Sequence, residues 1–386
     1  MRVSSGFDSG AIEVVQTIAP TSGGAIELAI RRDDTSDPAC DFRQWFHFRV
    51  QGSRGEARIL RLGNASACTY PQGWEGYQAV ASFDREHWTR VPTRLVDGAL
   101  EITHAGTHET VWYAYFEPYS WERHMALIGR AGRTHGVAIE DLGSTVDGRD
   151  IDLVRVGDLR TARHQVWVIA RQHPGETMAE WFVEGLLDRL LDPSDALARA
   201  LRTECVFNIV PNMNPDGAVR GNLRANAAGA NLNREWMAPD ALRSPEVLAV
   251  RQRMQQTGVD LFLDVHGDEA LPWVFVAGSE MLPGFTAEQE RLQALFTTRF
   301  CEATPDFQTR HGYPSGKYSA DSLRLASKWV GHTFGCLSLT LEMPFKDNAD
   351  WPDPSVGWNG ARSRRLGAAA LDPIRAACLA RAGAGR

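Results

Sequence analysis

Five short runs of nearly continuous apolar residues lie beyond residue 118, and they limit the fold more strongly than any other feature of the sequence. They occupy 165–170 (QVWVIA), 206–210 (VFNIV), 260–265 (DLFLDV), 273–277 (WVFVA) and 336–341 (CLSLTL). A strand that is apolar on both sides must be covered on both faces, as the central strands of α/β sheets are. Helical patterns flank these runs, at 120–133, 178–191, 286–300 and 361–382, the last with a break expected before Pro373. We therefore predict an α/β domain with a mixed, largely parallel twisted sheet flanked by helices.

The chain before about residue 117 has a different hydrophobic period. Apolar side chains alternate with other residues at 26–30, 46–50 and 111–115, and Gly, Pro, Asn and Asp cluster between these segments. A period of two is typical of short antiparallel strands with one buried face. We predict an all-β sandwich over 1–117, followed by the α/β domain over 118–386. A length of 386 residues also favours two domains.

Composition narrows the classes of partner. A formal charge of −7 disfavours a nucleic-acid surface, because phosphate binding usually needs a basic face. No apolar run approaches the ~20 residues that span a bilayer, and the first residues lack the apolar core of a secretory signal. The six cysteines are far apart, with no CxxC pair, which favours reduced thiols. We expect a cytoplasmic protein with neither nucleic acid nor a membrane among its partners.

The strongest chemical signal is a set of metal-binding residue types at strand ends. His173 and Glu176 directly follow the run 165–170, and His266 closes the run 260–265. Each is weak evidence alone, since HxxE arises often by chance and a lone buried histidine is more often part of a core. Together they form the ligand set of hydrolytic zinc sites, at the sheet edge where α/β folds gather ligands. Asp264 shares the strand face of His266 and is expected to orient its ring.

Two further segments add polar groups to the same domain. The stretch 209–236 is rich in Asn, Gly and Arg and has almost no apolar periodicity. A solvated loop built on Asx-turns is one interpretation; the other is a recognition loop whose arginines bind carboxylates. Glu342 ends the run 336–341. An acid there is usually just solvated, but it could also face the metal, where a general base belongs.

Taken in order, HPGE, NPDG, GNLR, NLNR, VHG and LEMPF resemble the motifs of the zinc carboxypeptidase family M14. Within it the chain is similar to the cytosolic carboxypeptidase branch, whose known members remove glutamates from protein tails and carry a β-rich domain before the catalytic one. The resemblance implies a metallocarboxypeptidase that hydrolyses the C-terminal peptide bond of peptides or protein tails, with one zinc ion per chain. Acidic residues, glutamate above all, are the implied side-chain preference.

The resemblance also implies roles for single residues. The three residues at the strand ends match the zinc ligands, and Glu342 matches the general acid/base. Arg224 matches the arginine that polarises the scissile carbonyl and stabilises the oxyanion. Asn233 and Arg234 match the pair that holds the terminal carboxylate of the substrate.

Some positions depart from the family pattern or stay open. Gly175 stands where pancreatic-type enzymes have an arginine. Tyr318 is the expected substrate-closing tyrosine, with Tyr313 as its rival. Arg324 and Lys328 precede Glu342 and could bind an acidic side chain, but surface charges on a helix are the preferred interpretation of both.

Two other functions compete with peptide trimming. One is a zinc deacylase or amidohydrolase that acts on N-acyl amino acids or cell-wall peptides. The other is a non-catalytic module that binds peptide ends. Release of free amino acid from an unblocked peptide, compared with release from an acylated amino acid, separates the first from a carboxypeptidase, and zinc without turnover indicates the second.

Overall fold

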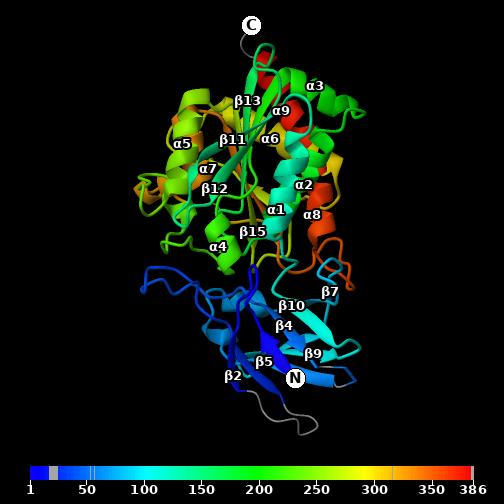
Figure 1. Cartoon of the computed structure of the whole chain (residues 1–386). Coiled ribbons are helices and arrows are strands. Elements are labelled where there is room, and N and C mark those ends of the chain that lie inside the picture. Colours follow the sequence, from blue (N-terminus) through cyan, green and yellow to red (C-terminus); the bar gives the residue numbers. More distant parts are fainter. Residues whose placement is uncertain (17–24, 53, 56, 315, 384–386) are drawn as a thin grey trace.

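The apolar runs form the middle of a seven-stranded sheet. The computed structural model describes residues 1–16, 25–52, 54–55, 57–314 and 316–383 (Figure 1). The sheet has the order β11-β12-β14-β13-β15-β17-β16. Four of its strands, β14, β13, β15 and β17, pair in parallel with one another. The strands are β11 (Val137–Ser144), β12 (Asp150–Val156), β13 (His164–Ala170), β14 (Cys205–Val210), β15 (Leu261–Asp268), β16 (Phe275–Ala277) and β17 (Leu337–Pro344). The mixed sheet flanked by helices is therefore confirmed.

Helices cover both faces of this sheet. Successive side chains of β13 point to opposite faces and are apolar on both, so both faces must be covered. Val166 and Val168 belong to one buried cluster with α1, α2, α6, α8 and α9, while Trp167 and Ile169 belong to another with α5 and α7. The helices are α1 (Trp121–Gly132), α2 (Met178–Leu190), α3 (Ala196–Glu204), α4 (Pro215–Arg220), α5 (Pro245–Thr257), α6 (Ala287–Ala303), α7 (Ala326–Phe334), α8 (Gly360–Ala369) and α9 (Leu371–Gly383). The last two helices occupy the helical segment expected at 361–382. The break that was expected before Pro373 falls at Ala370.

The edge strand β11 and its neighbour β12 were missed by the sequence analysis. β11 is largely exposed or half-buried, and β12 mixes buried with accessible positions, so neither carries a continuous apolar run. Both pair antiparallel with their neighbours. A strand at or next to the edge of a sheet is less completely buried, so it does not need an apolar residue at every position. Its sequence therefore predicts a strand less clearly.

The N-terminal part consists of two five-stranded sheets. One has the order β1-β4-β10-β6-β7 and the other β2-β3-β5-β9-β8. Antiparallel strands were expected throughout, but β3 and β5 pair in parallel. Buried side chains of both sheets belong to one cluster, as in a sandwich. The strands are β1 (Arg2–Ser4), β2 (Glu13–Gln16), β3 (Ile26–Ala29), β4 (His47–Gln51), β5 (Ala57–Leu62), β6 (Val80–Ser82), β7 (Thr89–Arg90), β8 (Thr93–Val96), β9 (Ala99–Ala105) and β10 (Thr110–Ala114).

The two parts share a continuous core. Tyr115, just after β10, stacks on Phe345, just after β17, with ring centroids 4.5 Å apart. Arg90 donates hydrogen bonds to the carbonyls of Phe345 and Trp358, at 2.8 and 2.9 Å. The proposed boundary at 117/118 falls between β10 and α1. The β-rich part thus packs against the end of the large sheet at which its central strands finish (Figure 1).

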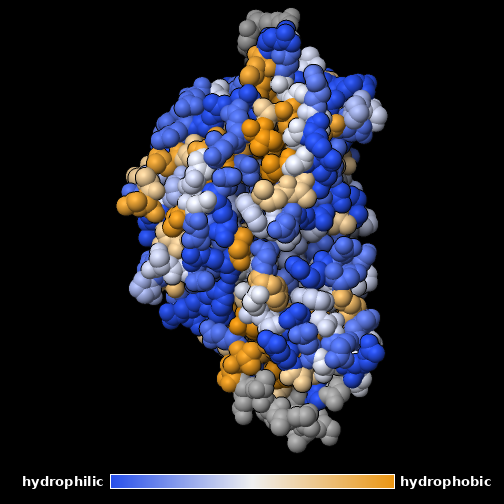
Figure 2. Space-filling view, in the orientation of Figure 1, coloured by the Kyte–Doolittle hydropathy of each residue, from blue (hydrophilic) through white to orange (hydrophobic). Residues whose placement is uncertain are grey.

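Part of the apolar surface remains exposed to solvent. On the face shown in Figure 2, hydrophilic residues dominate and apolar residues gather in separate patches. Within the described ranges, no helix combines the length and the apolar composition needed to cross a bilayer.

A buried charge network holds the segment that follows β13. His124 of α1 lies between Glu180 of α2 and Asp152 of β12, with Nδ1–Oε1 and Nε2–Oδ2 distances of 2.6 and 3.1 Å. Arg171, whose φ is +59°, also binds Glu180 at 2.6 Å and donates to the carbonyl of Pro174 at 3.0 Å. The network therefore fixes the backbone turn by which the chain leaves β13.

This network makes stability depend on pH. Burial lowers the pKa of His124, but the carboxylates of Glu180 and Asp152 outweigh it and raise that pKa from 6.5 to about 9. The charged histidine stabilises the fold fully below pH 6.5, and this stabilisation is lost as the pH rises through 9. We expect the free energy of unfolding to decline across that window by up to about 3 kcal/mol. Chemical denaturation of the wild type and His124→Gln tests this, with exposed His135→Gln as the control. An equal decline in all three proteins would contradict the assignment.

Candidate metal centre

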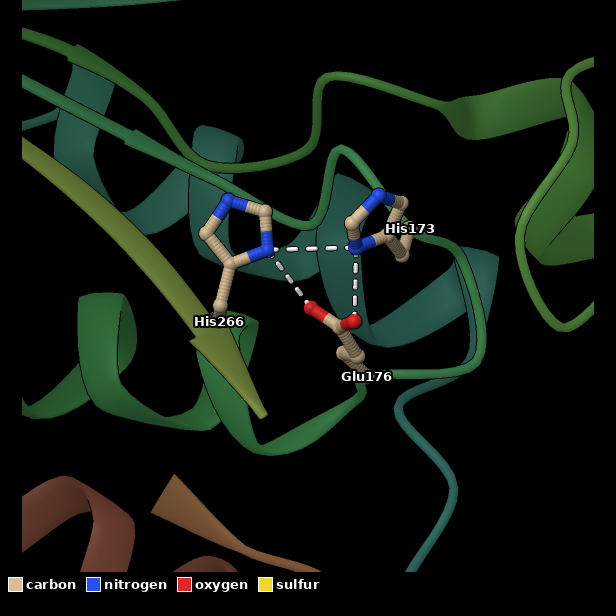
Figure 3. A group of neighbouring side chains, drawn as sticks. All are labelled: His173, Glu176 and His266. Atoms are coloured by element: carbon tan, nitrogen blue, oxygen red, sulfur yellow. Dashed lines mark hydrogen bonds and ion pairs between the residues drawn. The ribbon is translucent and has the colours of Figure 1, made fainter. Parts of the chain in front are cut away.

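Two imidazoles and one carboxylate meet at the carboxyl ends of neighbouring strands. His173 and Glu176 lie between β13 and α2, while His266 lies on β15, which pairs directly with β13 (Figure 3). Nδ1 of His173 is 2.6 Å from Glu176 Oε1, and Nδ1 of His266 is 2.8 Å from Glu176 Oε2. The two Nδ1 atoms are 3.2 Å apart. All three side chains are buried, and their ligand atoms lie within 4.8 Å of one another.

The outer nitrogen of each imidazole has its own partner. His266 Nε2 is 2.9 Å from Asp264 Oδ2, and Gln172 donates to the same oxygen at 2.8 Å. His173 Nε2 is 3.0 Å from Asn231 Oδ1. An acceptor at Nε2 favours the tautomer whose Nδ1 lone pair points inward, toward the other ligand atoms. Asp264 lies where the sequence analysis expected it, whereas Asn231 was known only as one of many asparagines in its loop.

The charges of the group favour a cation. Burial and the positive charge of Arg224 lower the pKa of His173 to about 3, which leaves the ring in the neutral form that binds metals. Burial also lowers the pKa of His266, but Asp264 and Glu176 outweigh it and raise that pKa well above 6.5. Two nitrogens and one carboxylate, buried and oriented from outside, fit the three protein ligands of a hydrolytic zinc site with an open position.

Glu342 stands beside this group because of strand register. In the parallel pair β15/β17, His266 is opposite Glu342. The carboxyl is buried, and its Oε2 has no hydrogen-bond partner among the described residues. Burial, and then the nearby carboxylates of Glu176 and Asp268, raise the pKa of Glu342 well above 4.5, against the opposing effect of His266. A cation at the ligand group would lower that pKa and make the carboxylate available as a base.

Tyr313 is the tyrosine that reaches this carboxyl. Its hydroxyl lies 3.0 Å from Glu342 Oε1 and 2.8 Å from Asp268 Oδ2, so its one proton is shared between two carboxylates, and its ring packs edge-on against Phe275. Tyr318 is exposed and outside the set of residues that line the cavity, so its role as the substrate-closing tyrosine stays a prediction. Its rival Tyr313 is the one whose hydroxyl reaches Glu342 in this structure.

Three polar residues of the Asn-rich stretch border the ligand group. Arg224 Nη1 is 3.8 Å from Glu176 Oε1. Asn233 is buried on the short helix Leu232–Arg234 and accepts a hydrogen bond from the Ala326 amide at 2.9 Å. Arg234 is exposed and donates to the Asn233 carbonyl at 2.7 Å. The stretch is thus a wall of the site, where a solvated loop was the competing interpretation.

These side chains line one cavity of about 1190 Å³. The cavity is also lined by residues that the sequence analysis did not select. These are Tyr70 and Gln72 from the β-rich part, and buried Glu269 just after β15. Burial raises the pKa of Glu269 to about 8. Proximity to the metal motifs could have suggested Glu269, which is three residues from His266. No local signal marks Tyr70 or Gln72, because they reach the site only through domain packing.

Lys328 corrects another expectation. The side chain is 8% exposed and lines the cavity, although a surface charge was preferred. It lies in the first turn of α7, between buried Ser327 and Trp329. These neighbouring residues were the available indication in the sequence that Lys328 is buried. Arg324 is exposed, as expected.

Comparisons with known proteins match both parts of the chain. The family model described as "Cytosolic carboxypeptidase N-terminal domain" matches residues 3–116, and the one described as "Zinc carboxypeptidase" matches residues 131–355. The structure is similar to that of a metallo-carboxypeptidase from Burkholderia cenocepacia, with 54% identity, a TM-score of 0.93 and coverage of 98% of both chains.

Two further relatives extend the comparison. A metallo-carboxypeptidase from Pseudomonas aeruginosa, in complex with (2-guanidinoethylmercapto)succinic acid, has 48% identity and a TM-score of 0.91, over 97% of this chain and 98% of that one. Human cytosolic carboxypeptidase 6 is 28% identical over 350 residues, which are 81% of this chain and 66% of that protein. The present chain therefore spans about two thirds of the human protein.

The ligand geometry predicts one tightly bound zinc ion per chain. We expect His266→Ala to lose it, because two of three ligands remain. Asp264→Asn should weaken binding about 10–100-fold, since it changes only the outer contact of one imidazole. Elemental analysis and competition with a chromogenic chelator measure both effects. His135→Ala, at an exposed histidine, should keep the wild-type zinc content. Full zinc occupancy in His266→Ala would refute the assignment.

Proposed function

The chain belongs to the zinc carboxypeptidase family and is a metallocarboxypeptidase, and we propose that it removes C-terminal residues from peptides or protein tails with one zinc ion at His173, Glu176 and His266. The observation that carries the proposal is the register of β15 and β17, which sets Glu342 beside these three side chains. The cavity they line also includes Arg224, Asn233 and Arg234.

Glu342 is the proposed general acid/base. Zinc at this position would supply a Lewis acid that lowers the pKa of a water molecule from 15.7 to about 7. The Glu342 carboxylate accepts one proton from the attacking water and delivers it to the leaving amine as the C–N bond breaks. Its unpartnered Oε2 supports this role, because that oxygen is free for such a transfer. The Tyr313 hydroxyl holds the other oxygen and orients the carboxyl.

Arg224 is the proposed donor to the developing oxyanion. Its guanidinium lies 3.8 Å from Glu176 and therefore next to the place where the scissile carbonyl must sit. A fixed positive donor in a buried site stabilises charge as it develops. Arg234 and Asn233 are proposed to hold the terminal carboxylate, which only a chain end provides. The succinic acid derivative bound by the Pseudomonas aeruginosa relative carries two carboxyl groups and so supports carboxylate recognition.

Lys328 supports a preference for acidic side chains. Lys328 is buried and lines the cavity, which Glu280 also lines. Burial lowers the pKa of Lys328 against the opposing effect of the Glu280 carboxylate, so a further anionic partner from the substrate would stabilise the charged ammonium. We propose that the carboxylate of a C-terminal glutamate or aspartate provides that partner.

The catalytic proposal predicts loss of turnover in Glu342→Gln. Glutamine cannot accept the proton, so the rate of C-terminal trimming should fall by a factor on the order of 10²–10⁴. Mass spectrometry of a peptide library with free C-termini measures the products. A chelator-treated sample and the variant Glu302→Gln, at an exposed position of α6, are the controls. Undiminished trimming by Glu342→Gln would refute its role.

Two other outcomes would replace the proposal as a whole. Hydrolysis confined to N-acyl amino acids or cell-wall peptides would make the protein a deacylase or amidohydrolase. Zinc binding with no turnover of any peptide would make it a module that binds peptide ends.

The side-chain proposal predicts a selective effect of Lys328→Met. Loss of a charge-assisted contact should lower kcat/KM for peptides ending in glutamate by roughly 10–100-fold. Peptides ending in leucine should be cleaved at least as well as by the wild type. Arg324→Met, at the exposed neighbour, is the matched control. An unchanged ratio of glutamate to leucine cleavage would contradict the assignment.

A further inference from the structure

A single carboxylate of the β-rich part caps the loop that carries Arg224. Asp33 lies between β3 and β4 and is 8% exposed. Its Oδ1 accepts a hydrogen bond from the Leu223 amide at 2.6 Å, and its Oδ2 accepts from the amides of Arg224 and Ala225 at 2.9 and 2.8 Å. Three consecutive backbone donors therefore depend on one side chain from the other end of the sequence.

The neighbouring residues fasten the start of the same loop. Asn222 accepts from the Asp34 amide at 2.6 Å and donates to the Asp34 carbonyl at 3.1 Å. Arg31 donates to the carbonyl of Arg220. The segment around Asp33 thus runs along the Arg224 loop and pairs with it at several points, so the loop cannot shift without breaking these bonds together.

The opposite side of the loop rests on the metal centre. The Gly175 amide, between the ligands His173 and Glu176, donates to the Leu223 carbonyl at 2.9 Å. A Cβ at position 175 would lie 3.0 Å from that carbonyl oxygen and 3.1 Å from the Leu223 Cα. A side chain at position 175 would therefore crowd the backbone of the Arg224 loop. The Arg224 loop is held between Asp33 on one side and the metal-ligand turn on the other.

The β-rich part also holds the Arg224 side chain. The guanidinium carbon lies 5.3 Å from the centroid of the Tyr70 ring, within the range of cation–π attraction. The Tyr70 backbone is fixed in turn by Gln44, which binds both its amide and its carbonyl, at 3.2 and 3.1 Å. Backbone and side chain of Arg224 thus depend on the same domain.

We propose that the N-terminal domain completes the active site by positioning Arg224, through the Asp33 carboxylate on its backbone and the Tyr70 ring on its guanidinium. This inference rests on the proposed function, in which Arg224 stabilises the oxyanion. The domain is then a part of the catalytic machinery, and Asp33 and Tyr70 are positioning residues. Asparagine cannot replace Asp33, because an amide has one acceptor oxygen for three donors and presents its own N–H groups to them.

Steady-state kinetics on a peptide with a free C-terminus tests the proposal in the full chain. An oxyanion donor acts in the transition state, so a misplaced Arg224 should lower kcat and leave KM within about twofold. We expect Asp33→Asn to lower kcat roughly 10–100-fold with a full complement of zinc. Asp41→Asn, at an exposed aspartate of the same segment, should match the wild type. Wild-type kcat in Asp33→Asn, or a fall explained by lost zinc, would overturn the proposal.

A double-mutant cycle shows whether Asp33 acts through Arg224. In an Arg224→Lys background, Asp33→Asn should cost no more than about twofold in kcat, because the positioned group is already gone. A cost equal to that in the wild type would overturn the proposal. If Asp33→Asn fails to fold, Tyr70→Leu carries the test: kcat should fall, and Tyr70→Phe should recover most of the loss. Equal kcat values for these two variants would overturn it. An inactive wild type would instead refute the proposed function.

Discussion

The parallel pairing of β13, β15 and β17 is the constraint on which the site depends. Because the three strands end at the same edge of the sheet, the segment after β13 and the end of β15 bring His173, Glu176 and His266 within contact of one another, and the end of β17 places Glu342 opposite His266. The strands are covered by helices on both faces and cannot slide without exposing apolar side chains. The packing of the core therefore fixes the geometry of the ligand group.

Several charged side chains near that edge are paired with a neighbour. Arg171 and His124 share Glu180 behind the metal-ligand turn, and Asp264 orients His266. An unpaired charge in such a low-dielectric region is costly, so these contacts both fix the side chains and set their protonation. Two carboxylates of the cavity differ, because Glu342 Oε2 and Glu269 Oε1 lack a hydrogen-bond partner in the described part of the chain. In the proposed function Glu342 Oε2 is the atom that meets the attacking water.

The two domains divide the work of building the site. The α/β domain supplies the metal ligands and Glu342 from the ends of neighbouring strands and from the turn that follows β13. The Arg224 loop has no strand or long helix to hold it, and its backbone donors are satisfied by Asp33 from the β-rich domain. A catalytic group on a loop needs such external support, because small displacements of a transition-state donor cost much of its effect.

The sequence alone determined the features that depend on neighbours along the chain. Apolar runs at 165–170 and 336–341 indicated buried strands, because burial on both faces requires apolar residues at every position. The motifs around His173, His266 and Glu342 indicated the chemistry. Only the tertiary structure decided which residues outside these motifs approach or support the site: Tyr313 beside Glu342, Lys328 on the cavity wall, and Asp33 on the Arg224 loop from across the domain interface. Their positions follow from loop courses and domain packing, and these depend on contacts between residues that the sequence separates by tens to hundreds of positions.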